Sequence, residues 1–297
     1  MRLPNLFIVG AAKCGTTSLH RYLSQHPDIF MAGGMEPVYF GDDIRHQWKI
    51  RDRQRYFNLF ADAGAQSWVG EKSVWYMASR SAAAEIRTFC PEAKIIIMLR
   101  NPVDMVYSLH AHFLWNGNED IRDFDKAIAA VEARKKGQQI PPAAHFPDGL
   151  NYLDIAKYTE QVARYLTAFP ASQVHIVIYD DFRQDPLREC RRTFRFLGVD
   201  DSFRPDMERH NPSKEVKSLF LTRMLKAEPW YYRAIPLPLR ERIAWRLRRF
   251  NARVAERKPM RPELRSYLQR HYAGDIQQLS RLLGRDLTHW CRPAQPL

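Results

Sequence analysis

The sequence predicts an α/β fold in which a mostly parallel central sheet is flanked by helices in three layers. Apolar runs without alternation, at residues 6–9 and 94–99, are typical of parallel strands buried on both faces. Segments with helical periodicity alternate with such runs along the chain. This order of elements builds a parallel sheet.

Five strands are expected, each a short run bounded by turn residues. Residues 6–9 (LFIV) and 94–99 (KIIIML) are continuously apolar, and residues 173–179 (QVHIVIY) are rich in β-branched side chains. Residues 29–31 follow the helix-breaking His-Pro-Asp at 26–28. Residues 68–72 complete the set.

Helices are expected between these strands. The helix at 16–25 places Leu19 and Leu23 on one side. Another helix begins after Asn101, because Asn caps helices and Pro suits the first helical position. The remaining helices are expected at 79–89, 124–136, 152–169 and 186–197, the last ended by Gly198. From about residue 215 onward the chain is expected to be helical and basic. The aromatic residues Trp75, Tyr76 and Trp115 are interpreted as core residues, with an acceptor-pocket lining as the alternative.

Composition narrows the classes of partner and compartment. The 297 residues suffice for a substantial core, and 46 Lys and Arg against 33 Asp and Glu give a net charge of +13. That charge favours an anionic partner such as a nucleotide, nucleic acid, anionic lipid or acidic sugar. The four cysteines are scattered without a C-x-x-C pair, which argues against zinc and gives no support for disulfides. No apolar run approaches the roughly 20 residues of a membrane span, so a soluble cytoplasmic protein is expected.

The loop after the first strand has the arrangement of a phosphate-binding loop. Residues 10–18 read GAAKCGTTS and join a buried strand to a helix, where backbone N–H groups and the helix N-terminus can hold a phosphate. Lys13 supplies a positive charge, and Thr16 and Thr17 supply hydroxyls. The glycines have the spacing of the P-loop pattern G-x-x-x-x-G-K-[ST], but Thr16 stands where that pattern has lysine. We therefore expect a P-loop-like fold whose phosphate-binding loop is of a different kind. An ordinary strand–helix turn is the alternative.

A second candidate site follows the strand at 94–99. Arg100 stands at the carboxyl end of this strand, where parallel sheets bind ligands. Ser108 lies two helical turns beyond Asn101 and can share its helix face. Arg100 and Ser108 can therefore converge on one anion, although Arg-Asn-Pro is also a common helix entry.

Together the two junctions resemble the sulfotransferase family that depends on 3′-phosphoadenosine 5′-phosphosulfate (PAPS). FIVGAAKCGTTSL is similar to that family's 5′-phosphosulfate loop, and LRNPVDMVYS is similar to its 3′-phosphate site. Further matches are MEPVYF at 35–40, GEKS at 70–73 and YDDF at 179–182. The set is more similar to the heparan-sulfate-type and bacterial carbohydrate-type branch than to the cytosolic steroid and phenol branch, and it covers about residues 3–198.

The resemblance implies roles for individual residues. The 5′ end of PAPS would be held by Lys13, Cys14, Gly15, Thr16, Thr17 and Ser18, and the 3′-phosphate by Arg100 and Ser108. Glu36 would take the acceptor's proton as general base, Lys13 would stabilise the leaving phosphate, and Lys72 would lie near the reaction centre. Arg257 and Lys258 would close over the cofactor, although Arg257-Lys258-Pro259 departs from the family's Lys-Gly-Arg-like element. Met35 departs from the lysine of the branch's Lys-Glu-Pro.

The function implied is transfer of a sulfonate from PAPS to an acceptor hydroxyl on a sugar or small natural product. Adenosine 3′,5′-bisphosphate would be the second product, and no metal is expected. We expect one domain over 1–297, with an α/β core at 1–214 and a helical portion at 215–297. An acceptor lid and a cofactor-closing segment are one interpretation of that helical portion. The sequence does not predict the oligomeric state.

Two other functions stay open. The first is a kinase-like phosphotransferase that uses ATP with Mg²⁺, although the place of Lys13 argues against it. The second is a non-enzymatic module that binds a membrane or another anion through residues 216–258, which carry 12 Lys and Arg against 3 Glu and include an expected amphipathic helix at 235–250. A lid and a plain solvated face are the competing interpretations of that stretch. Nucleic acid is not expected, since no recognition motif accompanies the charge.

Overall fold

The computed structural model describes residues 2–33, 36–142, 144–207, 214–216, 246, 252–254 and 259–292. The chain divides into two units. The first unit comprises residues 1–105, 157–210 and 269–297, and the second comprises residues 106–156 and 211–268.

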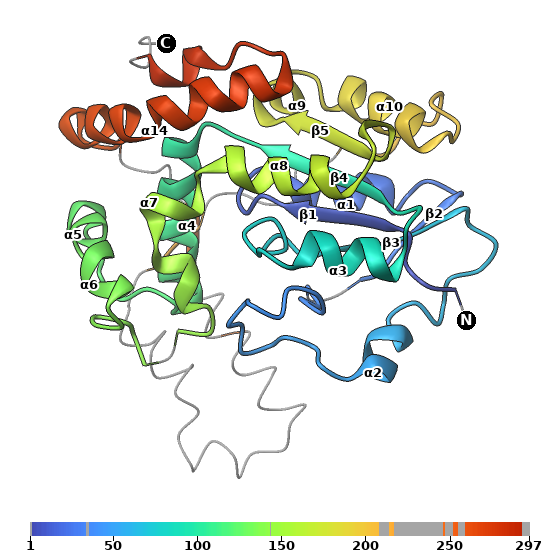
Figure 1. The fold of residues 1–297 in the computed structure, drawn as a ribbon, viewed down its shortest axis with the longest axis horizontal. Helices are drawn as coiled ribbons and strands as arrows, with labels where there is room; N and C mark the ends of the chain where they lie inside the picture. The colour runs from blue at the N-terminus through green and yellow to red at the C-terminus, as the bar shows by residue number, and fades with distance from the viewer. Residues whose placement is uncertain are drawn as a thin grey trace. The chain divides into compact units, whose positions relative to one another are not determined.

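The first unit is built on a five-stranded parallel sheet with the order β2-β3-β1-β4-β5 (Figure 1). Its strands are β1 (Leu6–Gly10), β2 (Ile29–Met31), β3 (Trp68–Lys72), β4 (Lys94–Leu99) and β5 (Val174–Ile178). All five expected strands are confirmed. Every residue of the central strand β1 is buried, as the unbroken apolar run predicts.

Helices cover both faces of this sheet (Figure 1). Contacts join α1 (Thr16–Leu23) to α10 (Pro186–Leu197), and α3 (Ala82–Phe89) to α8 (Tyr158–Ala168). The unit also contains α2 (Arg53–Asn58), α9 (Tyr179–Gln184) and the 3-10 helices η2 (Ala171–Gln173) and η3 (Thr288–Cys291). The helix expected at 186–197 is confirmed at both ends, with Gly198 left-handed at its C-terminus.

The second unit contains α5 (Phe124–Ala129), α6 (Val131–Lys135), η1 (Pro147–Leu150) and α7 (Tyr152–Ile155). Two long helices cross the boundary between the units along the chain, α4 (Pro102–Asn116) and α14 (Pro262–Leu283). As predicted, α4 begins at Pro102, and the side chain of Asn101 accepts the Val103 N–H at 3.0 Å.

Several expected elements are wrong in their bounds. The helix expected at 152–169 is interrupted, because Asp275 of α14 caps a new helix start by accepting the N–H groups of Tyr158 and Thr159 at 2.8 and 3.2 Å. The helix expected at 124–136 is divided at Ala130. The helix expected at 79–89 begins only at Ala82, after Ser79 accepts that residue's N–H at 2.9 Å.

The chain from about residue 215, which was expected to be helical, contains the helix α14 but also two short strands. β6 (Lys214–Val216) pairs with β7 (Ala252–Val254) in an antiparallel ladder. The amphipathic helix expected at 235–250 lies outside the described residues, apart from Arg246. No helix in the described part of the chain is long and apolar enough to cross a membrane.

A buried ion pair lies in the core of the second unit. Arg134 donates two hydrogen bonds of 2.7 Å to Glu119, and the Tyr152 hydroxyl donates a third of 2.9 Å. Burial would raise the pKa of Glu119, but the hydrogen bonds and the charge of Arg134 lower it. Glu119 therefore stays ionised and fully partnered inside the unit.

Replacing Glu119 by Gln should destabilise the protein by about 3–5 kcal/mol, because it leaves the Arg134 charge buried without a counter-charge. Denaturant unfolding monitored by circular dichroism measures this loss. The matched control is Asp125→Asn in the exposed pair with Arg261, which should change stability little because solvent screens that pair. Equal losses in both variants would show that the Glu119 pair contributes no more than a surface contact.

Candidate functional site

The loop between β1 and α1 leaves a helix N-terminus open to a ligand. Gly15 precedes α1 with a left-handed backbone (φ 92°) and, being glycine, has no side chain of its own to cap this helix end. Lys13 also has a positive φ of 63°. A strand, a glycine-containing loop and a helix start thus follow one another, which is the arrangement that the sequence predicts for a phosphate-binding loop.

The other loop residues differ in exposure. Thr17 is exposed and Ser18 is partly buried, whereas Cys14 and Thr16 are buried. The Cys14 thiol lies 3.4 Å from the Ala12 carbonyl oxygen and 3.9 Å from the Tyr158 hydroxyl. Burial raises the pKa of Cys14 to about 12, so its side chain is a protonated packing group. Any contact of Cys14 with a ligand is thus a main-chain contact.

Arg100 contacts this loop from the neighbouring strand. Its Nη1 donates to the Lys13 carbonyl oxygen at 3.2 Å, and its guanidinium lies 4.7 Å from the centre of the Tyr179 ring. The two junctions singled out in the sequence therefore lie side by side. Ser108 is buried on the part of α4 that belongs to the second unit, and its convergence with Arg100 stays a prediction. Arg257 and Lys258 lie outside the described residues.

Glu36 and Lys72 form an ion pair. Lys72 ends β3, and its ammonium donates to Glu36 Oε1. The Val74 N–H donates to Glu36 Oε2 at 3.2 Å. Both side chains are partly buried. The carboxylate predicted as a base is thus held by the lysine predicted to lie near it.

A cavity of about 250 Å³ opens beside this pair. Its lining comes from one face of α1 and from the segment opposite, and comprises Thr17, His20, Arg21, Ser24, Ala32, Glu36, Pro37 and Lys72. Thr17 also belongs to the phosphate-binding loop. The cavity therefore joins the helix N-terminus to the Glu36 carboxylate.

His20 is a cavity residue that the sequence reasoning missed. Its Nε2 lies 3.0 Å from the Ala32 carbonyl oxygen, which can only accept, so Nε2 carries the proton. Burial lowers the pKa of His20, and the ring is neutral at pH 7. The helical spacing from Thr17 to His20 on α1 was the available signal.

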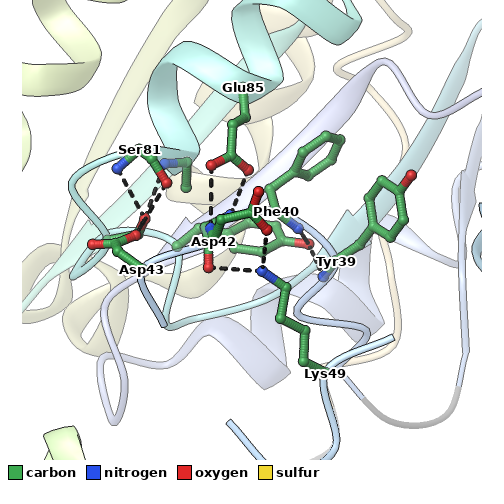
Figure 2. Close-up of polar contacts among 11 residues, drawn as sticks. Tyr39, Phe40, Asp42, Asp43, Lys49, Ser81 and Glu85 are labelled. Atoms are coloured by element: carbon green, nitrogen blue, oxygen red, sulfur yellow. Dashed lines mark hydrogen bonds and ion pairs between the residues drawn. The ribbon is translucent and has the colours of Figure 1, made fainter. Parts of the chain in front are cut away.

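Figure 2 shows how the segment beyond Glu36 is fastened at its far end. The N–H groups of residues 41–42 donate to the carboxylate of Glu85, on α3, at 2.7 and 3.1 Å. The buried ammonium of Lys49 donates to the Gly41 carbonyl oxygen at 2.8 Å. Asp43 accepts hydrogen bonds from the turn before α3. The loop that follows Glu36 is thus anchored by carboxylates.

Among the described residues, no group of three or more His, Cys, Asp or Glu is arranged to hold a metal ion.

A model of the sulfotransferase domain family matches residues 3–220. The chain belongs to the sulfotransferase family. Among the curated relatives of this chain is the bifunctional heparan sulfate N-deacetylase/N-sulfotransferase 2 of Bos taurus. It is 29% identical over an alignment of 204 residues that covers 67% of this chain and 22% of the relative. Carbohydrate sulfotransferase 15 of Mus musculus is 25% identical over 247 residues, covering 66% of this chain and 44% of the relative. The chain thus spans less than half the length of these curated relatives.

A solved sulfotransferase from Alicyclobacillus acidocaldarius has a similar fold. Its TM-score is 0.75 at 30% identity, and the match covers 98% of this chain and 100% of that one. The fold class and the family resemblance predicted from the sequence are therefore confirmed.

Replacing Gly15 by Ala should weaken binding of adenosine 3′,5′-bisphosphate about tenfold or more. Left-handed backbone costs a residue with a Cβ about 1–2 kcal/mol, and this Cβ would lie 3.2 Å from the Tyr179 ring. Isothermal titration calorimetry measures the affinity. Gly64→Ala is the control, since its Cβ would meet its nearest neighbour only at 3.5 Å. Unchanged affinity in Gly15→Ala would exclude the loop as the phosphate site.

Proposed function

We propose that this sulfotransferase transfers a sulfonate from PAPS to a hydroxyl of a sugar or small natural product. One observation carries the proposal: the Glu36–Lys72 pair lines a cavity that begins at Thr17 of the phosphate-binding loop. A proton acceptor and an anion-binding helix end thus share one polar space. Curated relatives named for carbohydrate and heparan sulfate sulfotransfer support a sugar acceptor.

The residues fit a nucleotide with phosphates at both ends of its ribose. The N-terminus of α1, which begins after Gly15, suits the 5′-phosphate, and Arg100 stands beside the loop as a second anion anchor. Bound PAPS would supply the sulfonate and a phosphate leaving group that takes the electron pair of the broken sulfur–oxygen bond.

The protein's part is to move one proton and to stabilise charge. Glu36 accepts the proton of the acceptor hydroxyl as its oxygen bonds to sulfur. Lys13 stabilises the negative charge that develops on the leaving phosphate. Lys72 orients the Glu36 carboxylate through their ion pair. Arg21 adds positive charge to the cavity lining, where hydroxyl-rich and anionic acceptors find donors.

Replacing Glu36 by Gln should lower transfer by about a hundredfold or more, because general base catalysis is lost. Affinity for adenosine 3′,5′-bisphosphate should stay the same. The assay follows ³⁵S from labelled PAPS into a panel of oligosaccharides and hydroxylated natural products, and into free sulfate with water as acceptor. The exposed Glu160→Gln is the control. Unchanged turnover in Glu36→Gln would remove Glu36 from the mechanism.

Replacing Arg100 by Ala should weaken adenosine 3′,5′-bisphosphate far more than ADP. Loss of a charged hydrogen bond costs about 1.5–3 kcal/mol, or roughly ten- to a hundredfold in affinity. Calorimetry with both nucleotides measures the difference, with the exposed Arg195→Ala as control. Equal weakening would place Arg100 away from the 3′-phosphate. Mg²⁺-dependent turnover of ATP without response to PAPS would instead favour the phosphotransferase.

A further inference from the structure

Glu71 is a buried carboxylate at the centre of a hydroxyl cluster. It lies on β3 directly before Lys72 and is 1% exposed. Three hydroxyls donate to it at 2.8 Å: Tyr56 and Tyr76 to Oε1, and Ser73 to Oε2. An ionised carboxylate only accepts hydrogen bonds, so Glu71 fixes the direction in which all three hydroxyls point their protons.

Two of these hydroxyls hold the backbone that follows Glu36. The Val38 N–H donates to Ser73 Oγ at 3.0 Å. The N–H groups of Tyr39 and Phe40 donate to the Tyr76 hydroxyl oxygen at 2.8 and 3.3 Å. A hydroxyl can accept these bonds because its own proton is directed to the carboxylate. Glu71 thereby acts on residues 38–40 without touching them.

The held backbone is strained. Val38 is fully buried and has a φ of 45°, a left-handed conformation that β-branched residues rarely adopt. Such a conformation persists only where the surroundings enforce it. The hydrogen bond from the Val38 N–H to Ser73 is one such enforcing contact. The chain direction two residues after Glu36 therefore depends on this cluster.

We propose that Glu71 is a positioning residue that sets the Glu36 carboxylate for proton transfer through Ser73, Tyr76 and the backbone of residues 38–40. The inference rests on the proposed function, in which Glu36 is the base. β3 and the turn after it fix both the side chain of Glu36 and the backbone that follows it. Lys72 and Val74 bind its carboxylate, and the Glu71 cluster binds the backbone behind it.

The protonation state of Glu71 supports this role. Burial raises its pKa to about 7, the three hydroxyls oppose that rise, and the Glu36 charge adds to it. The titratable groups that face Glu71 are Tyr56 from α2, Tyr76 after β3, Tyr165 from α8, and Glu36. The three tyrosines stay neutral, because burial raises their pKa values well above the usual range.

Titration of Glu71 affects turnover and stability with opposite signs. A protonated carboxyl must itself donate and so disrupts the cluster, which makes turnover rise as pH increases through about 7. The folded protein, however, binds this proton more tightly than the unfolded chain does. Its contribution to stability is thus present below the ordinary pKa of 4.5 and is lost as pH rises through about 7.

A pair of tyrosine variants tests the proposal. Tyr56→Phe and Tyr76→Phe each remove one 2.8 Å bond to the same oxygen of Glu71, but only Tyr76 also holds the backbone after Glu36. Turnover should fall roughly tenfold to a hundredfold in Tyr76→Phe and by less than about twofold in Tyr56→Phe. The readout is ³⁵S-labelled PAPS hydrolysis with water as acceptor. Rates are divided by the number of adenosine 3′,5′-bisphosphate sites found by calorimetry, so that unfolded protein does not count.

The pH dependence of turnover in Glu71→Gln distinguishes a positioning role from a merely structural one. Its turnover should fall with unchanged nucleotide affinity, and the rise in rate near pH 7 should disappear while Tyr56→Phe retains it. Equal rates in the two tyrosine variants, or a wild-type pH profile in Glu71→Gln, would overturn the positioning role. If the positioning role of Glu71 is overturned but Glu36→Gln is inactive in the same assay, the proposed function still stands. Full turnover in Glu36→Gln would overturn both.

Discussion

The pairing of β1 with β3 on one side and with β4 on the other is the constraint on which the candidate site depends. Because all three strands run parallel, their carboxyl ends meet at one edge of the sheet. This pairing places the loop after β1, Lys72 at the end of β3 and Arg100 after β4 at the same edge of the sheet. The buried apolar side chains of β1 and β4 hold it in place.

The sequence predicts well what depends on local pattern. The unbroken apolar runs locate the strands, and the Pro and Gly signals locate the ends of α4 and α10, because these features act within a few residues. The phosphate-binding loop and Arg100 follow from their places at strand ends. Elements that depend on distant partners are predicted poorly. The break before α8 needs Asp275, more than a hundred residues away, and no local pattern records it.

The same reason explains why Glu71 and His20 escape a reading of the sequence. A glutamate near the end of a short strand carries no sign of the hydroxyls that meet it, since Tyr56 comes from α2 and Tyr76 from the turn after β3. The strain at Val38 is equally invisible, because valine is an ordinary strand residue. The family resemblance predicted that Glu36 and Lys72 lie near each other. The hydrogen bonds between them could be known only from the structure.

Glu71 and Lys72 are consecutive residues on one strand, so their side chains leave opposite faces of the sheet. Glu71 supports the backbone of residues 38–40 from the side of α3 and α8. Lys72 binds the carboxylate of Glu36 from the side of α1. Inserting or deleting a single residue within β3 would exchange the two faces. A change in length by one residue is therefore not tolerable within this strand.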